Sequence, residues 1–179
     1  MDKKIKDLIN NSTTGSQLND NSNNKKYGGG KSNVILYKEL FKYKNLTNLF
    51  KDANIVFILY EWANKIGHWV VLIKTGNYIE FFDSYDYPPD EEFAFIPAEF
   101  HYKPILTKLL ANSNPKFNLN YNNYKFQKGG NVATCGRHCL VRAWFKDMNI
   151  DDYKGMLDYI KENTGYDYDT IVTILTQNI

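Results

Sequence analysis

Three apolar runs follow one another along the chain, and their spacing restricts the fold more than any other feature. Residues 54–60 form a continuous β-branched and aromatic run, which is typical of a strand buried on both faces. A second such run covers residues 68–74, and a turn at residues 75–77 joins it to an alternating run at residues 78–83. The pattern therefore predicts a hairpin inside a central, mostly antiparallel sheet.

Helices are expected around these strands. Apolar periodicity predicts them at residues 46–50, 104–111, 153–162 and 169–175, and it predicts a short strand at residues 124–127. Strands mixed with separate helices indicate an α+β fold, in which the central sheet packs against helices.

The first 33 residues differ in composition from the rest. An apolar pattern at residues 5–9 predicts a short helix, and residues 10–31, rich in Asn, Ser and Gly, are expected to form a flexible linker. We therefore divide the chain into an N-terminal segment, residues 1–33, and one domain, residues 34–179. That domain is large enough to bury a core.

Charge and cysteine usage exclude several classes of protein. A net charge of +2 predicts no general attraction to nucleic acid, and no apolar run reaches membrane-spanning length. The N-terminus shows no secretory pattern. Cys135 and Cys139 lie four residues apart on one expected helix, where a disulfide would be strained. We expect a soluble, intracellular monomer that needs no cofactor.

Cys135 stands just after a glycine-rich loop that contains Gly129 and Gly130, and just before an apolar segment, residues 140–148. Apolar residues recur there at spacings of three and four, which predicts a buried helix. The N–H groups and the dipole at a helix N-terminus favour a thiolate and can donate to an oxyanion. On these residues alone, a small buried cysteine without a chemical role is an equally good interpretation.

A cysteine nucleophile needs a base, and the chain offers three histidines. His101 stands in a polar, proline-containing segment and is expected at the surface. His138 follows Cys135 by one helical turn, so a structural role is favoured. A zinc site made by Cys135, His138 and Cys139 is disfavoured, because three ligands on one helical turn do not suit tetrahedral geometry. His68, at the mouth of a buried strand, is the best candidate for the base.

Asp83 ends the neighbouring strand and is expected opposite His68 at the open end of the hairpin. A carboxylate there can fix the imidazole tautomer and stabilise the imidazolium. Asp86 is a competitor, but it lies in the turn beyond the strand. Gln127 precedes Cys135 by eight residues, and its amide could donate to an oxyanion together with the Cys135 N–H.

The order His, Asp, Gln, Cys and its surroundings resemble the adenovirus-type (adenain-like) maturation proteases. The matching motifs are Gly67-His68-Trp69, Phe81-Phe82-Asp83-Ser84, Gln127 and Asn131-Val132-Ala133-Thr134-Cys135-Gly136. SUMO-deconjugating Ulp-type proteases share the same fold and order. From about residue 34 onward, the chain looks most like the maturation proteases of virophages and related DNA viruses.

The resemblance implies the adenain/Ulp-type cysteine-protease fold, with the nucleophile at the N-terminus of a buried helix and with no metal. The residues that take the family's roles are His68 as base, Asp83 as its orienting group, Cys135 as nucleophile, Gln127 as oxyanion donor, and Trp69, Gly136 and Trp62 along the substrate cleft.

Several features depart from the family pattern. Thr134 stands where the SUMO proteases have Asp, and the loop from Gln127 to Cys135 is slightly longer than in either relative. Adenovirus enzymes use Glu where this chain has Asp83, a change that the role tolerates. Their disulfide-linked activating peptide would need a third cysteine, which the sequence lacks, and a net charge of +2 gives no support to DNA as an activating partner.

The resemblance implies an endopeptidase that cleaves after small residues at Gly-Gly-like sites. Its substrates would be viral capsid or other structural precursor proteins, in the virion and in the viral factory of the host cytoplasm. The chain's own stretch at residues 27–30 could then be an autocleavage site or lie in the cleft, although a plain flexible linker is favoured. The alternatives are an isopeptidase that removes ubiquitin-like or SUMO-type modifiers, an acetyltransferase, and a capsid-binding module without activity.

Overall fold

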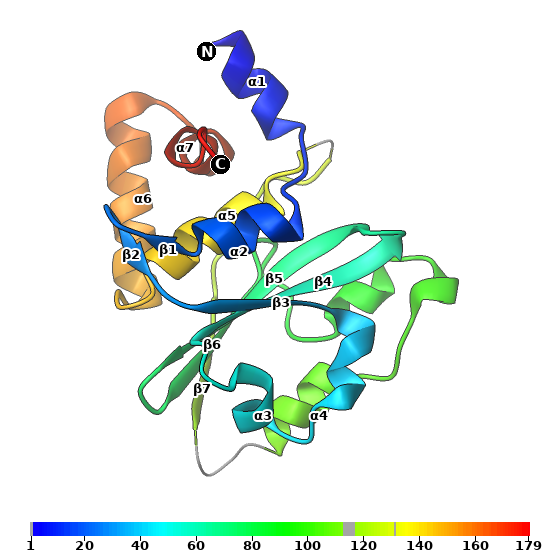
Figure 1. The fold of residues 1–179 in the computed structure, drawn as a ribbon. Helices are drawn as coiled ribbons and strands as arrows, with labels where there is room; N and C mark the ends of the chain where they lie inside the picture. The colour runs from blue at the N-terminus through cyan, green and yellow to red at the C-terminus, as the bar shows by residue number, and fades with distance from the viewer. Residues whose placement is uncertain (1, 113–116, 131) are drawn as a thin grey trace.

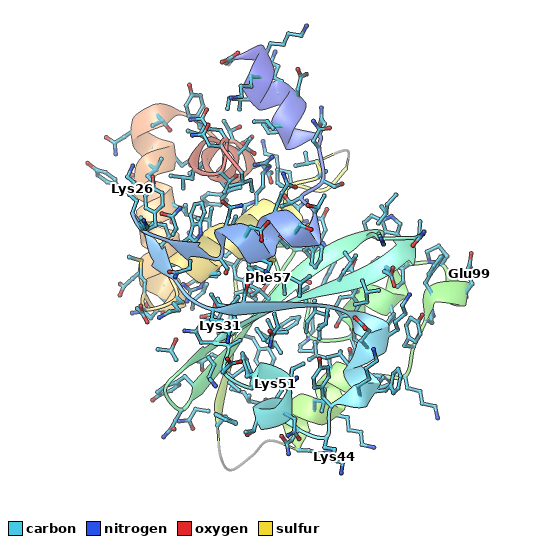
Figure 2. The ribbon with its side chains drawn as sticks, in the orientation of Figure 1. Lys26, Lys31, Lys44, Lys51, Phe57 and Glu99 are labelled. Carbon is cyan, nitrogen blue, oxygen red and sulfur yellow. The ribbon has the colours of Figure 1, made fainter. Side chains whose placement is uncertain are left out.

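The fold is built on a five-stranded sheet with helices on both faces (Figure 1). The computed structural model describes residues 2–112, 117–130 and 132–179. In spatial order the strands are β3 (Ser32–Leu36), β4 (Ile55–Ala63), β5 (Ile66–Thr75), β6 (Tyr78–Phe82) and β7 (Asn118–Tyr121). The neighbours β4, β5 and β6 run antiparallel, whereas β3 and β7 join the two edges in parallel. The predicted α+β fold with a mostly antiparallel central sheet is confirmed.

Two layers of helices explain why the central strands are apolar on both faces. The first layer holds α2 (Gly15–Asn21), α5 (Cys135–Trp144), α6 (Ile150–Thr164) and α7 (Tyr168–Leu175), and the second holds η1 (Tyr37–Lys42), α3 (Leu46–Phe50) and α4 (Ile105–Ala111). Along β4, Phe57 and Leu59 pack in the core of the first layer, while Ile58 and Tyr60 pack in the second. Within the described part of the chain, no helix is long and apolar enough to span a membrane.

The helix α5 is buried along its length and ends at Trp144, before the predicted end at residue 148. Arg142 gives the reason. Its guanidinium is paired with the Glu80 carboxylate at 2.7 Å and also donates to the carbonyl oxygens of Phe145 and Met148. These acceptors satisfy a buried charge and hold the chain beyond Trp144 out of a helix.

The segment at residues 124–127, which was expected to be a strand, forms none in the structure, and β7 is the edge strand instead. The backbone N–H groups of Phe126 and Gln127 both donate to the Ser84 carbonyl oxygen, each at 2.9 Å. One carbonyl oxygen just after β6 therefore binds this segment, in place of the row of hydrogen bonds that a paired strand would form. Between β6 and α4 the chain forms two short 3-10 turns, Glu91–Ala94 and Ala98–Phe100.

Residues 2–33 are folded, so the expected flexible linker at residues 10–31 is corrected. Their elements are α1 (Lys3–Ile9), α2, β1 (Asn23–Asn24) and β2 (Gly28–Gly29). The helix α2 has a capping box at Thr14, and its Leu18 is fully buried in the core. One anchored leucine and one cap order this polar sequence. The division of the chain at residue 33 falls inside β3 and stays a prediction.

The glycines at residues 28–30 belong to a small hairpin. Gly29 has φ +105°, and a Cβ there would lie 1.9 Å from a backbone carbonyl oxygen, so only glycine fits. The neighbouring Tyr27 stacks on Trp144, with ring centroids 5.4 Å apart. Trp144 ends α5 and Cys135 begins it, which separates the hairpin from the cysteine by about 15 Å of helix. Autocleavage at these glycines stays an untested hypothesis.

Candidate active site

His68 and Asp83 meet at the open end of the β5–β6 hairpin. His68 belongs to β5, and Asp83 directly follows β6. The His68 Nε2 and Asp83 Oδ1 atoms are 2.9 Å apart, and each side chain is only 1% exposed. The structure thus forms the pair expected from the sequence, while the competitor Asp86 is exposed in the following turn.

The Asp83 carboxylate and backbone are both held in place. Asp83 Oδ1 also accepts from the Tyr85 N–H at 2.7 Å. The Asn122 side chain accepts from the Asp83 N–H at 2.9 Å and donates to the Asp83 carbonyl oxygen at 2.7 Å. This pair of bonds ties the end of β6 to the end of β7 and fixes the Asp83 backbone, while the bond from the Tyr85 N–H holds the carboxylate itself.

Cys135 is the first residue of α5, and its side chain is half-buried. Cys135 lies close enough to His68 to contribute to the raised pKa of the imidazole. Because Nε2 of His68 is bonded to Asp83, Nδ1 is the ring nitrogen left for the thiol. Acid, imidazole and thiol therefore stand in the order that nucleophilic catalysis by cysteine requires.

Charge and burial act in opposite directions on His68. Burial lowers the pKa of the imidazole, but the charge and hydrogen bond of Asp83, followed by those of Cys135, outweigh it and hold that pKa well above its usual value. The Tyr85 ring stacks on His68 at 4.8 Å between centroids. Burial and the nearby charge of Cys135 raise the pKa of Tyr85, so its phenol stays neutral. The imidazolium form of His68 is thus favoured beside the thiol.

Gln127 is buried against the loop that leads to Cys135. Its Oε1 accepts from the Ser84 hydroxyl, and its Nε2 donates to the Val132 carbonyl oxygen, both at 2.8 Å. Ser84 therefore fixes which end of the amide faces the loop. An amide nitrogen carries two N–H donors, and one of them is committed to Val132.

Asp169 on α7 organises the chain on the other side of Cys135. Its carboxylate accepts from the Thr134 hydroxyl, from the Lys128 N–H at 3.0 Å, and from the His138 Nε2 at 3.0 Å. Thr134 directly precedes Cys135, so Asp169 anchors the start of α5. His138 is fully buried in this arrangement, which agrees with a structural role.

The three residues assigned to the substrate cleft differ in their surroundings. Gly136 lies against Trp69, because a Cβ on Gly136 would be 3.1 Å from Trp69 Cδ1. The indole itself is buried. Trp62 is 40% exposed and lies two residues beyond Tyr60, which is the partner of His68 in the β4–β5 register. Trp62 therefore lies near the exposed end of β4, at the end of the sheet where His68 lies.

Glu92 adds a second carboxyl group to the His–Asp pair. The donor atoms of His68, Asp83 and Glu92 lie within 4.8 Å of one another, a group that could hold a metal ion. An ion there would have to replace the His68–Asp83 hydrogen bond. Glu92 is 4% exposed and burial raises its pKa, which favours the uncharged acid. Within the described ranges, the side chains of the disfavoured zinc site form no such group.

Sequence reasoning missed four polar residues that shape this site: Ser84, Glu92, Asn122 and Asp169. All four are buried. Asn122 follows β7, so recognising that strand would have placed it beside the end of β6. Asp169 sits 35 residues after Thr134, and no local pattern links the two.

Comparisons with known proteins add one clear relative. No protein-family model matches the chain. It is 34% identical over 153 residues to the protein named "Uncharacterized protein V9" of the Sputnik virophage, a match that covers 82% of this chain and 86% of that protein.

Two solved structures show a weaker likeness. A de-sumoylating protease is similar with a TM-score of 0.39 at 14% identity, covering 99% of this chain and 86% of that one. ChlaDub1 from Chlamydia trachomatis is similar with a TM-score of 0.31 at 15% identity, covering 100% and 80%. Both scores lie below 0.5, so these two likenesses support no conclusion about activity.

Proposed function

We propose that this chain, which belongs to the same family as the Sputnik virophage protein V9, is a cysteine endopeptidase with Cys135 as its nucleophile. One observation carries this proposal. A buried imidazole, held by Asp83 at 2.9 Å, interacts with a half-buried thiol at the start of a helix. A buried ion pair is costly to maintain, and a nucleophile is a chemical reason for it.

In the proposed reaction His68 takes the proton of Cys135, and the two form a thiolate–imidazolium pair. The thiolate attacks the carbonyl carbon of the substrate, and His68 returns its proton to the leaving amine as the C–N bond breaks. Water then hydrolyses the thioester and regenerates the thiol. Asp83 keeps the imidazole oriented and stabilises its positive charge throughout.

The oxyanion of the tetrahedral intermediate needs donors near Cys135. The first N–H groups of a helix have no intrahelical partner, so the Cys135 N–H is one candidate. The free N–H of the Gln127 amide is the second, because Ser84 turns the amide nitrogen toward the loop before Cys135. Removing one such donor typically costs about 10²- to 10³-fold in turnover.

We assign viral capsid or other structural precursor proteins as the substrate class, with cleavage after small residues in the virion or the cytoplasmic viral factory. The virophage relative and the sequence resemblance to maturation proteases support this assignment. Trp69, Gly136 and Trp62 are the residues that we propose for the cleft. Gly136 directly follows the proposed nucleophile and lies against Trp69.

The experiment that tests this function is co-expression of the full chain with the major capsid protein of the same genome, with Cys135→Ala as control. We expect capsid protein shortened only by the wild type, with a new end beside small residues. A thiol-specific alkylating agent applied to the same preparations should label Cys135 in the wild type. An unreactive Cys135 together with uncleaved capsid protein would contradict the proposal and favour the binding module.

A further inference from the structure

A short segment between α1 and α2, residues 9–13, crosses the start of the catalytic helix; we call it the N-terminal strap. The Ala133 N–H donates to the Ile9 carbonyl oxygen at 2.9 Å, and the Trp69 indole N–H donates to the Thr13 carbonyl oxygen at 2.9 Å. Figure 1 shows this stretch beside the loop that precedes α5. Ala133 lies two residues before Cys135, and Trp69 directly follows His68. One strap therefore bonds to both sides of the site.

Thr13 also packs against the residue after the nucleophile. A Cβ on Gly136 would lie 2.8 Å from the Thr13 Cβ, so the missing side chain of Gly136 makes room for Thr13. Thr13 is 4% exposed, and its hydroxyl is buried without a hydrogen-bond partner. Burying an unpaired hydroxyl is unfavourable, so packing, and not a hydrogen bond of its side chain, holds Thr13 in place.

Both ends of the strap are anchored. On one side α1 packs on α7, and its Ile5 is buried. On the other side Thr14 caps α2, and Leu18 is fully buried in the core. Asp169 of α7 binds Thr134 in the loop before Cys135, so this loop and the helix that precedes the strap both contact α7. The strap cannot shift without loosening contacts at both ends.

We propose that the N-terminal strap positions Cys135 against His68, with Thr13 as the positioning residue. This inference rests on the proposed function. Ile9 holds the nucleophile's loop, and the Thr13 carbonyl holds the strand of the base through Trp69. The Thr13 side chain keeps the two apart at a fixed spacing. A misplacement of about 1 Å at reacting atoms can cost about 10²-fold, so a loose strap lowers reactivity.

The test uses three variants of the full chain. Thr13→Gly removes the contact with Gly136, Thr13→Val keeps its shape without the unpaired hydroxyl, and Ser12→Ala changes an exposed side chain of the same strap without loosening its backbone. The readout is the rate at which iodoacetamide alkylates Cys135 as pH varies, with mass spectrometry separating Cys135 from Cys139. The melting temperature is measured alongside.

We expect Thr13→Gly to slow alkylation of Cys135 about 10-fold near neutral pH, with the pH dependence of that rate moved toward that of His68→Gln. Thr13→Val and Ser12→Ala should match the wild type. A role in stability alone would lower the melting temperature and leave the pH profile unchanged, which would overturn the proposal. If Thr13→Gly does not fold, Trp69→Phe removes the N–H donated to Thr13 and should shift the profile in the same direction.

The alkylation rates also distinguish a wrong strap proposal from a wrong proposed function. Wild-type and Thr13→Gly proteins that are alkylated equally fast, both much faster than His68→Gln, would overturn the strap and leave the peptidase standing. Faster alkylation of Thr13→Gly would also overturn it, because the strap would then cover the thiol. A wild-type Cys135 no more reactive than in His68→Gln would overturn the proposed function and the strap with it.

Discussion

Two buried histidine–aspartate pairs flank the start of α5, and they differ in what the second ring nitrogen faces. The distance from Nε2 to Oδ1 is 2.9 Å in His68–Asp83 and 3.0 Å in His138–Asp169. The His68 ring interacts with Cys135, whereas Nδ1 of His138 is buried without a hydrogen-bond partner. The same chemical pair thus supports packing in one place and faces a thiol in the other.

The comparison teaches that a His–Asp pair is not by itself a sign of catalysis. The Asp169 carboxylate accepts hydrogen bonds from His138, Thr134 and the Lys128 N–H, and these bonds hold separate chain segments together. Asp83 supports the ring that meets the nucleophile. The two roles are distinguished by the group that lies beside the second ring nitrogen, more than by the aspartate that is bound to Nε2.

Replacing the two histidines one at a time should show the largest difference between the two His–Asp pairs. His68→Gln should lower peptidase turnover by at least about 10³-fold because it removes the base, and it should also cost about 1–3 kcal/mol of stability because it breaks the buried hydrogen bond to Asp83. His138→Gln should cost about 1–3 kcal/mol of stability and leave turnover within a few-fold, because it disturbs a buried hydrogen bond. Turnover with the precursor substrate and thermal unfolding measure both. Equal losses of turnover in the two variants would show that His138 acts in the reaction.

Asp83→Asn should lower turnover by about 10²-fold and shift its pH dependence. Without the carboxylate, burial dominates and the pKa of His68 falls, so the imidazolium that protonates the leaving amine is lost at lower pH and the falling limb of turnover moves to more acidic pH. Because the folded-state pKa of His68 is raised, its stabilising effect is complete below about pH 6.5 and is lost as pH rises through that folded-state pKa. Unfolding measured across pH should show the stability deficit of Asp83→Asn shrinking on the alkaline side. An unmoved falling limb would rule out Asp83 as the source of the raised pKa.

Asp169→Asn tests the second carboxylate in the same way, with a smaller effect. It should lower turnover about 10-fold, because Thr134 and the start of α5 lose a charged acceptor, and leave the pH profile of alkylation in place. Asp167→Asn, which changes the half-exposed N-cap carboxylate of the same helix to another good capping residue, is the matched control. A shifted pH profile in Asp169→Asn would mean that the two aspartates act on one ring.

The smallest effect should come from the second thiol. Cys139 is fully buried, its Sγ–H donates to the Trp69 carbonyl oxygen at 3.2 Å, and burial raises its pKa well above the usual value. Cys139→Ala should keep turnover within about twofold and cost about 1 kcal/mol of stability. Peptide mapping after alkylation should find label on Cys135 alone. A loss comparable to that of Cys135→Ala would overturn the choice of nucleophile.

Local patterns were sufficient for the central hairpin and for the pair it presents. The apolar runs at residues 54–60 and 68–74 predicted the strands, and the turn between β5 and β6 brought His68 and Asp83 together at the open end of the hairpin. This worked because hairpin geometry is fixed by residues close in sequence. Cys135 and Gln127 were singled out by their positions around the glycine-rich loop, and the resemblance to a protease family then gave them roles.

The supports of the site were beyond a reading of the sequence alone. Asn122 meets Asp83 across 39 residues, Asp169 meets Thr134 across 35, and Trp69 meets Thr13 across 56. Tertiary packing sets such contacts, and polar residues in polar surroundings give no periodic signal. The same limit explains the linker expected at residues 10–31, where one buried leucine outweighed a polar composition.

The bond from Thr134 to Asp169 also sets an order of events during synthesis. The ribosome makes Cys135 before it makes Asp169, so the nascent chain has its nucleophile before it has the helix that anchors the residue next to it. We expect the thiol to stay poorly poised until α7 has left the exit tunnel and docked. Under the proposed function, cleavage would begin only after this docking step.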